Sequence, residues 1–386
     1  MKTVSIEATQ RAWVEVDLAA IRSNLAALRS RLTPGCRILP MVKANGYGLG
    51  ASRVLRALAQ EAPWAYGVAT CEEGLGLRQE GFTGRVVVFT PSVKLDTEAL
   101  REGGLEPVAT GLEAFLALSA VTNSGAGPLP VHLEVDTGMG RAGLPAEEVD
   151  RWGPVIAKRL ARAQLRVEST FTHFHSADTD PEATHAQWQR FETAVGRLRR
   201  HGIDPGLLHA ANSAAVMRYE GYCADMVRPG IQLYGGGDWE PAPAPVARLC
   251  ARVLEVRDVP PGATVSYGAT FTTTRPSKLA TLAIGYGDGL RHHLGGRGRV
   301  LFGGHSAPIV GSVCMDVTVV DVTDVPAVGV GDVATLLGPD SGARIELESM
   351  AEECGTISYE ILTGLGSRLP RVEHPSAGAS NGGGEQ

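Results

Sequence analysis

The chain has 386 residues, of which 44% are hydrophobic and 20% charged, and its formal net charge is -6. This length allows a large core or two domains, while a mildly acidic chain without a Lys/Arg run gives no electrostatic basis for binding nucleic acid. No apolar run approaches the ~20 residues that span a bilayer, and residues 1–11 lack the apolar segment of a secretion signal. We therefore expect a cytoplasmic protein that binds neither nucleic acid nor membrane.

The six cysteines are scattered along the chain and form no CxxC pair. In a chain of this size, such spacing favours reduced thiols and argues against a disulfide framework or a zinc site. We therefore predict no metal site.

An amphipathic helix is the first expected element, over residues 18–32. Asp17 is its expected N-cap, and Leu18, Ile21, Leu25 and Leu28 form its apolar face. The first predicted strand follows this helix.

Eight strand candidates come next, with helical patterns between most of them. Parallel strands need helical crossovers, so eight such units predict an α/β fold with a (β/α)8 TIM-type barrel. An open doubly wound sheet is the alternative, but it usually carries G-x-G-x-x-G after its first strand, and none is present there. The predicted strands are Ile38–Val42, Tyr66–Thr70, Arg85–Thr90, Leu105–Thr110, Val131–Asp136, Glu168–Phe174, Leu207–Ala211 and Asp225–Arg228. The predicted helices include Ala51–Glu61, Cys71–Gly81, Leu112–Val121, Pro145–Ala163 and Pro181–His201.

A C-terminal all-β domain is expected after the proline-rich segment 241–245. Runs such as Ala251–Val256, Lys278–Ile284 and Ile309–Val322 are β-rich and separated by glycine turns, and one helix is expected near Ser358–Leu365. The sequence therefore predicts the barrel over residues 13–240, the β domain over 246–372 and a disordered Ser/Gly-rich tail over 373–386.

Polar side chains stand at the C-terminal ends of several predicted strands, where barrel enzymes place their catalytic groups. Lys43 is the most informative, because an apolar run delivers it into a glycine-rich loop. A lysine held at the mouth of a core can lose its proton and attack a carbonyl. Each residue alone has an ordinary structural explanation, such as a rim salt bridge or a helix cap, but together they indicate a site. The others are Arg141, His173, Asn212, Ser213 and Arg228.

The loops after the last two predicted strands suit a phosphate group. Asn212–Ala215 and Gly230-Ile231 can present backbone N–H groups, and Tyr47 can add a hydroxyl. A phosphate anchor combined with a strand-end lysine predicts pyridoxal 5'-phosphate, in which the lysine forms the Schiff base and the phosphate grip fixes the ring.

An ordered set of motifs, spread over residues 13–371, resembles the alanine racemase family. The set is much more specific than the lysine motif alone. Its members are Val42-Lys43-Ala44-Asn45-Gly46-Tyr47-Gly48, Asp136-Thr137-Gly138-Met139-Gly140-Arg141, Thr172-His173-Phe174, Asn212-Ser213, Val227-Arg228-Pro229-Gly230-Ile231, Ser266-Tyr267-Gly268, Ile284-Gly285-Tyr286-Gly287-Asp288-Gly289, Cys314-Met315-Asp316 and Ile357-Ser358-Tyr359-Glu360.

The resemblance implies a homodimer with shared active sites and a β domain that residues 1–12 also join. It implies that Lys43 holds the cofactor and acts as one base, while Tyr267 of the partner subunit is the opposite base. The implied cofactor-binding residues are Lys43, Tyr47, His173, Asn212, Ser213, Arg228, Gly230, Ile231 and Tyr359, and the implied substrate-binding residues are Arg141, Met315 and Tyr286.

The implied activity is an isomerase that interconverts L-alanine and D-alanine through a pyridoxal phosphate aldimine by a two-base mechanism and so supplies D-alanine. A racemase of another small amino acid, such as serine, is the alternative. A related decarboxylase would carry an acidic partner for the pyridine nitrogen, where Arg228 is expected here. A non-catalytic cofactor-binding protein of the barrel alone would lack residues 246–371.

Three positions depart from the family pattern. Glu134 stands where many members carry a lysine that becomes carbamylated, and our hypothesis is that its charge orients Arg141 towards the cofactor. An ordinary structural salt bridge is the alternative. Leu49 replaces a histidine and Ser312 an arginine, which leaves the preferred amino acid open.

Overall fold

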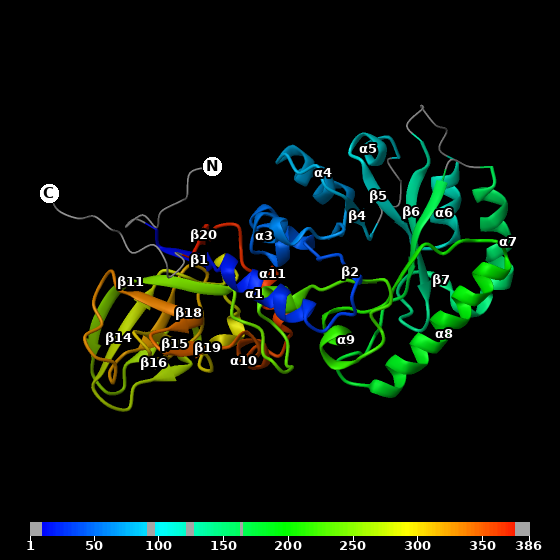
Figure 1. The fold of residues 1–386 in the computed structure, drawn as a ribbon. Helices are drawn as coiled ribbons and strands as arrows, with labels where there is room; N and C mark the ends of the chain where they lie inside the picture. Colours follow the sequence, from blue (N-terminus) through cyan, green and yellow to red (C-terminus); the bar gives the residue numbers. More distant parts are fainter. Residues whose placement is uncertain (1–9, 91–96, 121–126, 163–164, 375–386) are drawn as a thin grey trace.

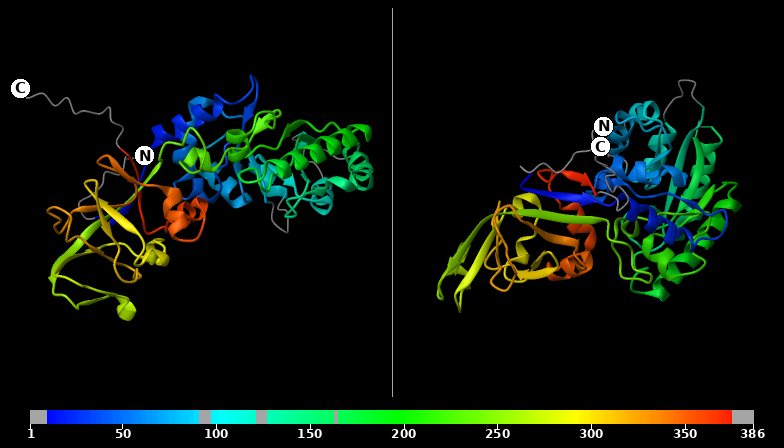
Figure 2. Two further views of the ribbon diagram at one scale, coloured as in Figure 1. Left: turned by 90° about the horizontal axis from the view of Figure 1, so that it is seen from below. Right: turned by 60° about the vertical axis from the view of Figure 1, so that its left-hand side comes forward.

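The structure is a computed structural model that describes residues 10–90, 97–120, 127–162 and 165–374. Within these ranges the chain forms two regions side by side, a curled parallel sheet with its helices and a nine-stranded, mostly antiparallel sheet (Figure 1). Two further views show the same elongated arrangement (Figure 2). Residues 1–9 and the part of the predicted tail from residue 375 onward lie outside the described residues.

The parallel sheet has the strand order β3-β4-β5-β6-β8-β9, with the short β7 beside β6. Strands β2 and β10 pair with each other in parallel, and single parallel bridges join Met41 to Gly67 and Asn212 to Arg228. Each of the eight predicted barrel runs overlaps one strand of this region, which confirms the expected parallel arrangement. The strands are β2 (Arg37–Ile38), β3 (Tyr66–Val68), β4 (Val86–Val88), β5 (Leu105–Ala109), β6 (Leu129–Asp136), β7 (Leu144–Pro145), β8 (Leu165–Phe171), β9 (Leu207–His209) and β10 (Met226–Val227).

Helices connect these strands, and α7 and α8 lie along the outer side of the parallel sheet (Figure 1). The predicted N-cap of α1 is confirmed, because Asp17 Oδ1 accepts hydrogen bonds from the backbone N–H groups of Ala19 (2.8 Å) and Ala20 (2.9 Å). Ile21 and Leu25 on its apolar face are fully buried. The helices are α1 (Leu18–Arg29), α2 (Lys43–Tyr47), α3 (Ala51–Leu58), α4 (Cys71–Gln79), α5 (Thr97–Glu102), α6 (Leu112–Ser119), α7 (Val149–Leu160), α8 (Pro181–Arg200) and α9 (Ser213–Arg218).

The second sheet has the order β16-β15-β18-β11-β1-β20, with β14, β17 and β19 attached beside this path. The long strand β11 is its centre and pairs with β1, β14 and β18, all antiparallel. The strands are β1 (Ala12–Val16), β11 (Ala247–Val259), β14 (Ser277–Leu282), β15 (Arg299–Phe302), β16 (His305–Pro308), β17 (Thr318–Asp321), β18 (Val333–Asp340), β19 (Ala343–Ile345) and β20 (Arg371–Glu373). A separate pair is formed by β12 (Thr264–Val265) and β13 (Phe271–Thr272).

Strand β1 corrects two predicted boundaries. It is buried along its whole length and lies between β11 and β20, so the chain leaves this sheet only at Asp17 and the predicted barrel start at residue 13 is wrong. Glu373 belongs to β20 and pairs with Val16, so the predicted tail does not begin at residue 373. Both errors have one cause, which is that strands distant in sequence satisfy each other's backbone hydrogen bonds.

The C-terminal region contains one α-helix more than predicted, α10 (Leu347–Glu353), before the expected α11 (Ser358–Thr363). Leu347, Met350 and Ala351 are its buried residues. Their i, i+3, i+4 spacing is helical, but a single apolar triplet is a weak signal in a short segment.

The two regions meet where α11 packs beside α2. Gly48 lies at the contact with φ +83, and a Cβ there would come within 2.3 Å of the Leu362 carbonyl oxygen. Arg371 Nε donates to the Gly48 carbonyl (2.9 Å). This close approach brings Tyr359 of the C-terminal region to the strand ends of the parallel sheet.

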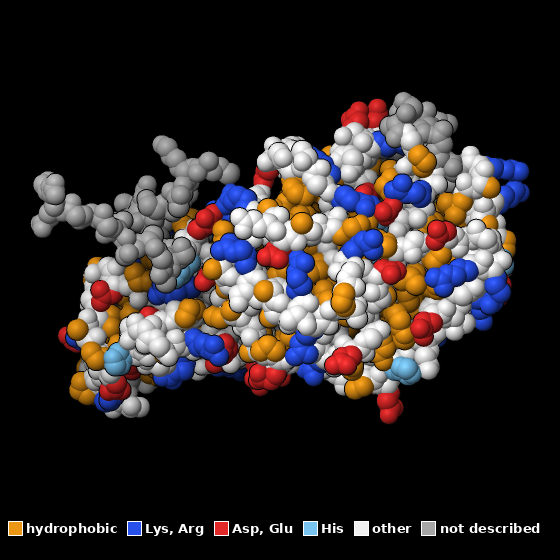
Figure 3. Space-filling model, viewed as in Figure 1, with side chains coloured by type: hydrophobic (Ala, Val, Ile, Leu, Met, Phe, Trp, Pro, Cys, Tyr) orange, Lys and Arg blue, Asp and Glu red, His pale blue; other side chains and the backbone are white. Residues whose placement is uncertain are grey.

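Charges of both signs are interspersed on the visible face of both regions (Figure 3). None of the helices in the described ranges combines the length and apolar character needed to cross a membrane.

Candidate active site

A cavity of about 390 Å³ lies at the C-terminal ends of the parallel strands. Its wall contains ten of the predicted site residues, which come from α2, α9, α11 and the loops after several strands. The expected convergence of these side chains is therefore confirmed, while their individual roles stay predictions. The ten are Lys43, Tyr47, Arg141, His173, Asn212, Ser213, Arg228, Gly230, Ile231 and Tyr359.

Several residues of the cavity wall were missed from the sequence. Most of them end or directly follow a strand, so their position could have indicated the cavity. They were missed because apolar and small side chains do not by themselves indicate a chemical role. They are Met41, Ala69, Phe89, Thr90, Thr110, Ala142 and Phe171.

Lys43 begins a turn of unusual backbone conformation. Ala44 and Asn45 have φ values of +51° and +54°, in the left-handed region that non-glycine residues rarely adopt. Glu73 braces this turn, because its Oε1 accepts from the Ala44 N–H (2.6 Å) and its Oε2 from the Ala69 N–H (2.7 Å). Glu73 on α4 thus ties the turn to the end of β3, which fixes the position from which the Lys43 side chain extends.

The Lys43 amine is surrounded by protein on most sides yet keeps solvent access through the cavity. Burial lowers the pKa of Lys43, and the Arg141 and Arg228 charges lower it further, against an opposing effect of Glu73. More of the amine is therefore neutral at a given pH than for a solvated lysine, which suits a nucleophile and a base.

Ser213 ties together the loops after β9 and β10. Its Oγ accepts from the N–H groups of Gly230 (2.9 Å) and Gln232 (3.4 Å). Asn212 caps α9 through its side-chain oxygen, so Asn212 and not Ser213 is the helix cap. Among the hydrogen bonds of the described residues, none is donated by the backbone N–H of Ile231. The Ile231 N–H, the Ser213 hydroxyl and the two loops thus lie together in the cavity wall, where the sequence predicts a phosphate cradle.

Tyr47 closes this cradle from the other side. Its ring stacks on Tyr234 with centroids 4.4 Å apart, and the Tyr234 hydroxyl donates to the Met41 carbonyl (2.8 Å). A Cβ at residue 230 would lie 2.2 Å from the Tyr47 hydroxyl, so only glycine leaves room there. The Tyr359 ring is 6.0 Å from that of Tyr47 and completes this wall.

Arg228 is a buried cation whose partners are fixed groups. Its two terminal nitrogens donate to His209 Nδ1 (2.6 Å), to the carbonyls of Thr172 (2.8 Å) and Ala210 (3.1 Å), and towards His173 Nδ1 (3.3 Å). None of its hydrogen bonds to the described residues uses Nε. That N–H is therefore available to a group in the cavity.

Burial leaves Arg228 charged and His173 neutral at neutral pH. Burial lowers the pKa of Arg228 to about 9, against an opposing effect of Glu134, so the guanidinium stays protonated at neutral pH. Burial and the Arg228 charge lower the pKa of His173 to about 3, so its imidazole is neutral. The guanidinium also lies 4.8 Å from the centre of the Phe171 ring, which favours the cation.

Glu134 lies in the cavity wall with a side chain that is 6% exposed. Its backbone pairs within the sheet, but no hydrogen bond or ion pair joins its carboxyl group to Arg141 or to another described side chain, so neither a direct orienting contact nor the alternative structural salt bridge is present. Burial raises the pKa of Glu134, although Arg141 and Arg228 oppose this. It is an acidic group surrounded by cations.

Three predicted site residues are not in the cavity wall of their own chain. Tyr267, Met315 and Tyr286 lie on the C-terminal region and are 77%, 52% and 44% exposed. Ser312, one of the three positions that depart from the family pattern, lies beside Tyr267, because its Oγ donates to the Tyr267 carbonyl (3.2 Å). Leu49, another departure, is fully buried in the core.

The cavity has the features that pyridoxal phosphate requires. A lysine amine of lowered pKa faces it, two loops offer a cradle that a Cβ at residue 230 would fill, and the Arg228 Nε–H remains to be paired. The fold and the site therefore define a pyridoxal-phosphate-dependent enzyme built on a curled parallel sheet with a sheet-rich C-terminal region.

Comparison with known proteins agrees with this class. Residues 16–238 match the family profile "Alanine racemase, N-terminal domain" and residues 246–373 match "Alanine racemase, C-terminal domain". The chain is 39% identical over 376 residues to an alanine racemase of Desulfosudis oleivorans, covering 94% of this chain and 96% of that protein. It is 40% identical over 370 residues to one of Geobacter sp. (strain M21), covering 93% and 97%. The chain belongs to the alanine racemase family.

Solved structures show the same likeness. Alanine racemase from Streptomyces coelicolor A3(2) superposes with a TM-score of 0.89 at 32% identity and covers 96% of this chain and 100% of that one. The enzyme from Bartonella henselae, which has covalently bound pyridoxal phosphate, gives 0.85 at 29% identity, with coverage of 95% and 100%. The Bacillus anthracis enzyme with bound L-Ala-P gives 0.87 at 31%, with coverage of 95% and 96%.

We expect Gly230→Ala to weaken cofactor binding by roughly tenfold or more, since a penalty of about 1.4 kcal/mol corresponds to tenfold. The new methyl group would occupy the space beside the Tyr47 hydroxyl. Titration of the purified protein with pyridoxal phosphate, followed by its absorbance, measures this affinity. Gly196→Ala on α8, where a Cβ meets nothing within 4 Å, is the matched control. Equal affinities for the two variants would contradict the assigned cradle.

Proposed function

We propose that this protein interconverts L-alanine and D-alanine with pyridoxal phosphate as cofactor. The observation that carries the proposal is the Lys43 amine, which faces a cavity shared with buried Arg228 and with the Ser213–Gly230 cradle. The proposal is supported by the family membership of the whole chain.

The bound cofactor supplies an aldehyde carbon for attachment of an amine and a ring that withdraws electrons from the substrate α-carbon. Lys43 would hold that carbon and move a proton on one face. The cradle of Ser213, Gly230 and Ile231, with Tyr47 and Tyr359, would hold the phosphate. Arg228 would face the ring nitrogen, and because an arginine donates and does not accept, it leaves that nitrogen unprotonated. This limits electron withdrawal and disfavours side reactions such as transamination.

A direct test is to incubate the purified protein with L-alanine, D-alanine or L-serine and follow optical activity by circular dichroism. We expect alanine of either hand to approach the racemic mixture, and serine to react more slowly. Borohydride reduction followed by peptide mapping is expected to label Lys43, and Lys43→Ala is expected to lose both label and activity. A label at another lysine, or racemisation by Lys43→Ala, would refute the assignment.

We further propose that the active enzyme is a homodimer in which Tyr267 of each chain serves the site of its partner. Tyr267 is absent from the cavity wall of its own chain and is 77% exposed. A catalytic side chain is normally less exposed, so we infer that a second chain covers it. Met315 and Tyr286 are exposed on the same region, and Ile357 is 61% exposed near Tyr359. A second copy of the chain would cover these apolar groups.

Mixing two inactive variants tests this arrangement. Chains of Lys43→Ala keep Tyr267, and chains of Tyr267→Phe keep Lys43, so a mixed dimer contains one intact site. Random reassortment after mild dissociation should therefore restore about a quarter of wild-type activity, since half of the dimers are mixed and each has one working site of two. A mixture that stays as inactive as its components would contradict a shared site.

The Tyr267→Phe dimer alone provides the control for the role of the phenol. Enantiomers have equal free energies, so kcat/KM must fall equally in both directions and cannot distinguish the two faces. Exchange of the α-hydrogen with deuterium in the solvent can. We expect the variant to retain exchange from one enantiomer and to lose it from the other, because Lys43 still serves its own face.

We propose that Glu134 acts on the site through its charge and not through a direct contact with Arg141. Its carboxylate raises the pKa of Arg228, and Glu134→Gln removes that support. We expect the variant to bind the cofactor and turn over more weakly, on the order of tenfold. Glu113→Gln, on an exposed side of α6, is the matched control. If the variant had the same cofactor affinity and turnover as wild type, the proposed role of the Glu134 charge would be contradicted.

Three broader assignments accompany this function. We infer that the eight strands close into a (β/α)8 barrel, which the Met41–Gly67 and Asn212–Arg228 bridges support. We assign residues 17–240 to this barrel and residues 12–16 with 246–373 to the β domain, on the pairing of β1 with β11 and β20. We also propose a cytoplasmic location, because cysteines that are scattered without a CxxC pair favour reduced thiols in a chain of this size.

A further inference from the structure

A continuous chain of hydrogen-bonded side chains leads away from Arg228 through the interior of the parallel sheet. His209 Nδ1 pairs with Arg228 (2.6 Å) and its Nε2 with Ser169 Oγ (2.8 Å). Ser169 Oγ pairs with His132 Nδ1 (2.6 Å), and His132 Nε2 with Glu106 Oε2 (3.1 Å). The chain thus begins at the C-terminal strand ends and finishes near the start of β5.

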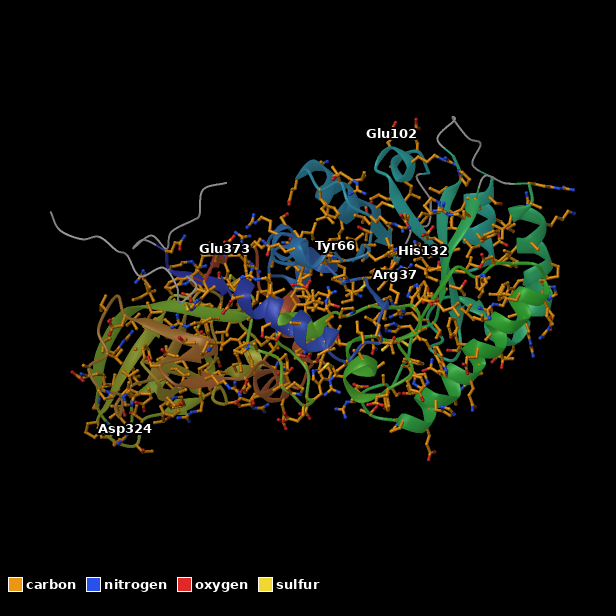
Figure 4. The ribbon with its side chains drawn as sticks, viewed as in Figure 1. Arg37, Tyr66, Glu102, His132, Asp324 and Glu373 are labelled. Carbon is orange, nitrogen blue, oxygen red and sulfur yellow. The ribbon has the colours of Figure 1, made fainter. Side chains whose placement is uncertain are left out.

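The strand register places these residues together. His132 on β6 is the register partner of Ser169 on β8, and His209 on β9 is the partner of Phe171 on β8. Figure 4 shows His132 among the parallel strands, away from the outer helices. His132, Ser169 and His209 are at most 1% exposed, so water has little access to the chain.

A charged group anchors each end. Arg85 holds Glu106 with two hydrogen bonds of 2.8 Å, from Nε to Oε1 and from a terminal nitrogen to Oε2. Burial by itself raises the pKa of Glu106, but the hydrogen bonds from His132 and Arg85 bring it below its ordinary value. The carboxylate is therefore ionised. Arg85 also pairs with Glu168 (2.8 Å) and stacks on Trp64 at the outer end.

Arg228 at one end and Glu106 at the other determine which atom carries the proton in each hydrogen bond of the chain. Arginine only donates, so His209 must accept at Nδ1 and, as a neutral imidazole, carry its proton on Nε2. Ser169 then accepts from His209 and donates to His132 Nδ1, and His132 donates from Nε2 to the acceptor-only carboxylate of Glu106. Burial and the Arg228 charge lower the pKa of His209 well below its ordinary value, which agrees with the neutral form.

We propose that Glu106, His132 and Ser169 are positioning residues that select the Nε2–H form of His209 and thereby hold Arg228 as a charged, fixed donor to the cavity. With the other form, His209 would place an N–H against the Arg228 N–H and push the guanidinium away. The structural part of this inference concerns the chain itself. Its effect on catalysis rests on the proposed function.

Ser169→Ala interrupts the chain without adding bulk. It leaves the His209 Nε2–H without an acceptor and His132 Nδ1 without a donor, so the selection between the two forms of His209 is lost. Glu106→Gln acts from the far end, because its amide can donate to His132 and reverse the order of donors. Ser169→Thr keeps the hydroxyl and serves as the rescue variant. Ser119→Ala, whose hydroxyl bonds only within α6, is the control.

The test is the nitrogen spectrum of the two histidines in the cofactor-loaded enzyme labelled with 15N-histidine. We expect wild type and Ser169→Thr to show Nε2–H for His132 and His209, and Ser169→Ala to show a mixture or the Nδ1–H form at His209. The cofactor absorbance band should shift in Ser169→Ala and Glu106→Gln, and kcat should fall on the order of tenfold with KM little changed. Ser119→Ala should match wild type in each respect.

Wild type with Nδ1–H on either histidine would overturn the inference, as would Ser169→Ala with an unchanged His209 spectrum and cofactor band. These results are separable from the proposed function. A protein with the expected histidine forms but no racemisation of alanine would refute the function and leave the proton arrangement standing. A racemase with the wrong histidine forms would do the reverse.

Discussion

The buried guanidinium of Arg228 is the constraint to which most of the site is fitted. A cation taken out of water must find fixed partners, and here they are His209, two backbone carbonyls and the edge of His173. Each partner belongs to β8, β9 or the loop that follows one of them. Satisfying one charge therefore fixes the spacing of three strand ends, and the proposed phosphate cradle lies on the loops after β9 and β10.

Burial lowers the pKa of both basic groups of the cavity, but it affects their charges differently because arginine starts from a higher pKa than lysine. It lowers the pKa of Lys43 so that more of the amine is neutral, whereas Arg228 falls only to about 9 and keeps its charge. One environment thus supports a nucleophilic base and a permanent cation. The strained turn after Lys43, braced by Glu73, holds the amine at the mouth of the same cavity.

The single chain builds a nearly complete cofactor site and leaves the groups expected on the opposite face at its surface. Tyr267, Tyr286 and Met315 are all exposed on the sheet-rich region, while Tyr359 of that region reaches the cavity of its own chain. The sheet-rich region therefore has two surfaces of interest. One contacts the parallel-sheet region of the same chain at Gly48. The other exposes Tyr267, Tyr286 and Met315, which the proposed dimer would place at the site of a second copy.

Sequence alone determined the alternation of the eight predicted barrel strands with helices, the strand-end lysine, the glycine at residue 230 and the family. These follow from local patterns, because a buried parallel strand is a short apolar run and a motif is contiguous. The extent and pairing of β1, the partners of Arg228 and the chain from His209 to Glu106 were decided only by tertiary structure. A histidine in an apolar strand signals that a polar partner must exist, but which residue supplies it depends on the register of strands that lie far apart in the sequence.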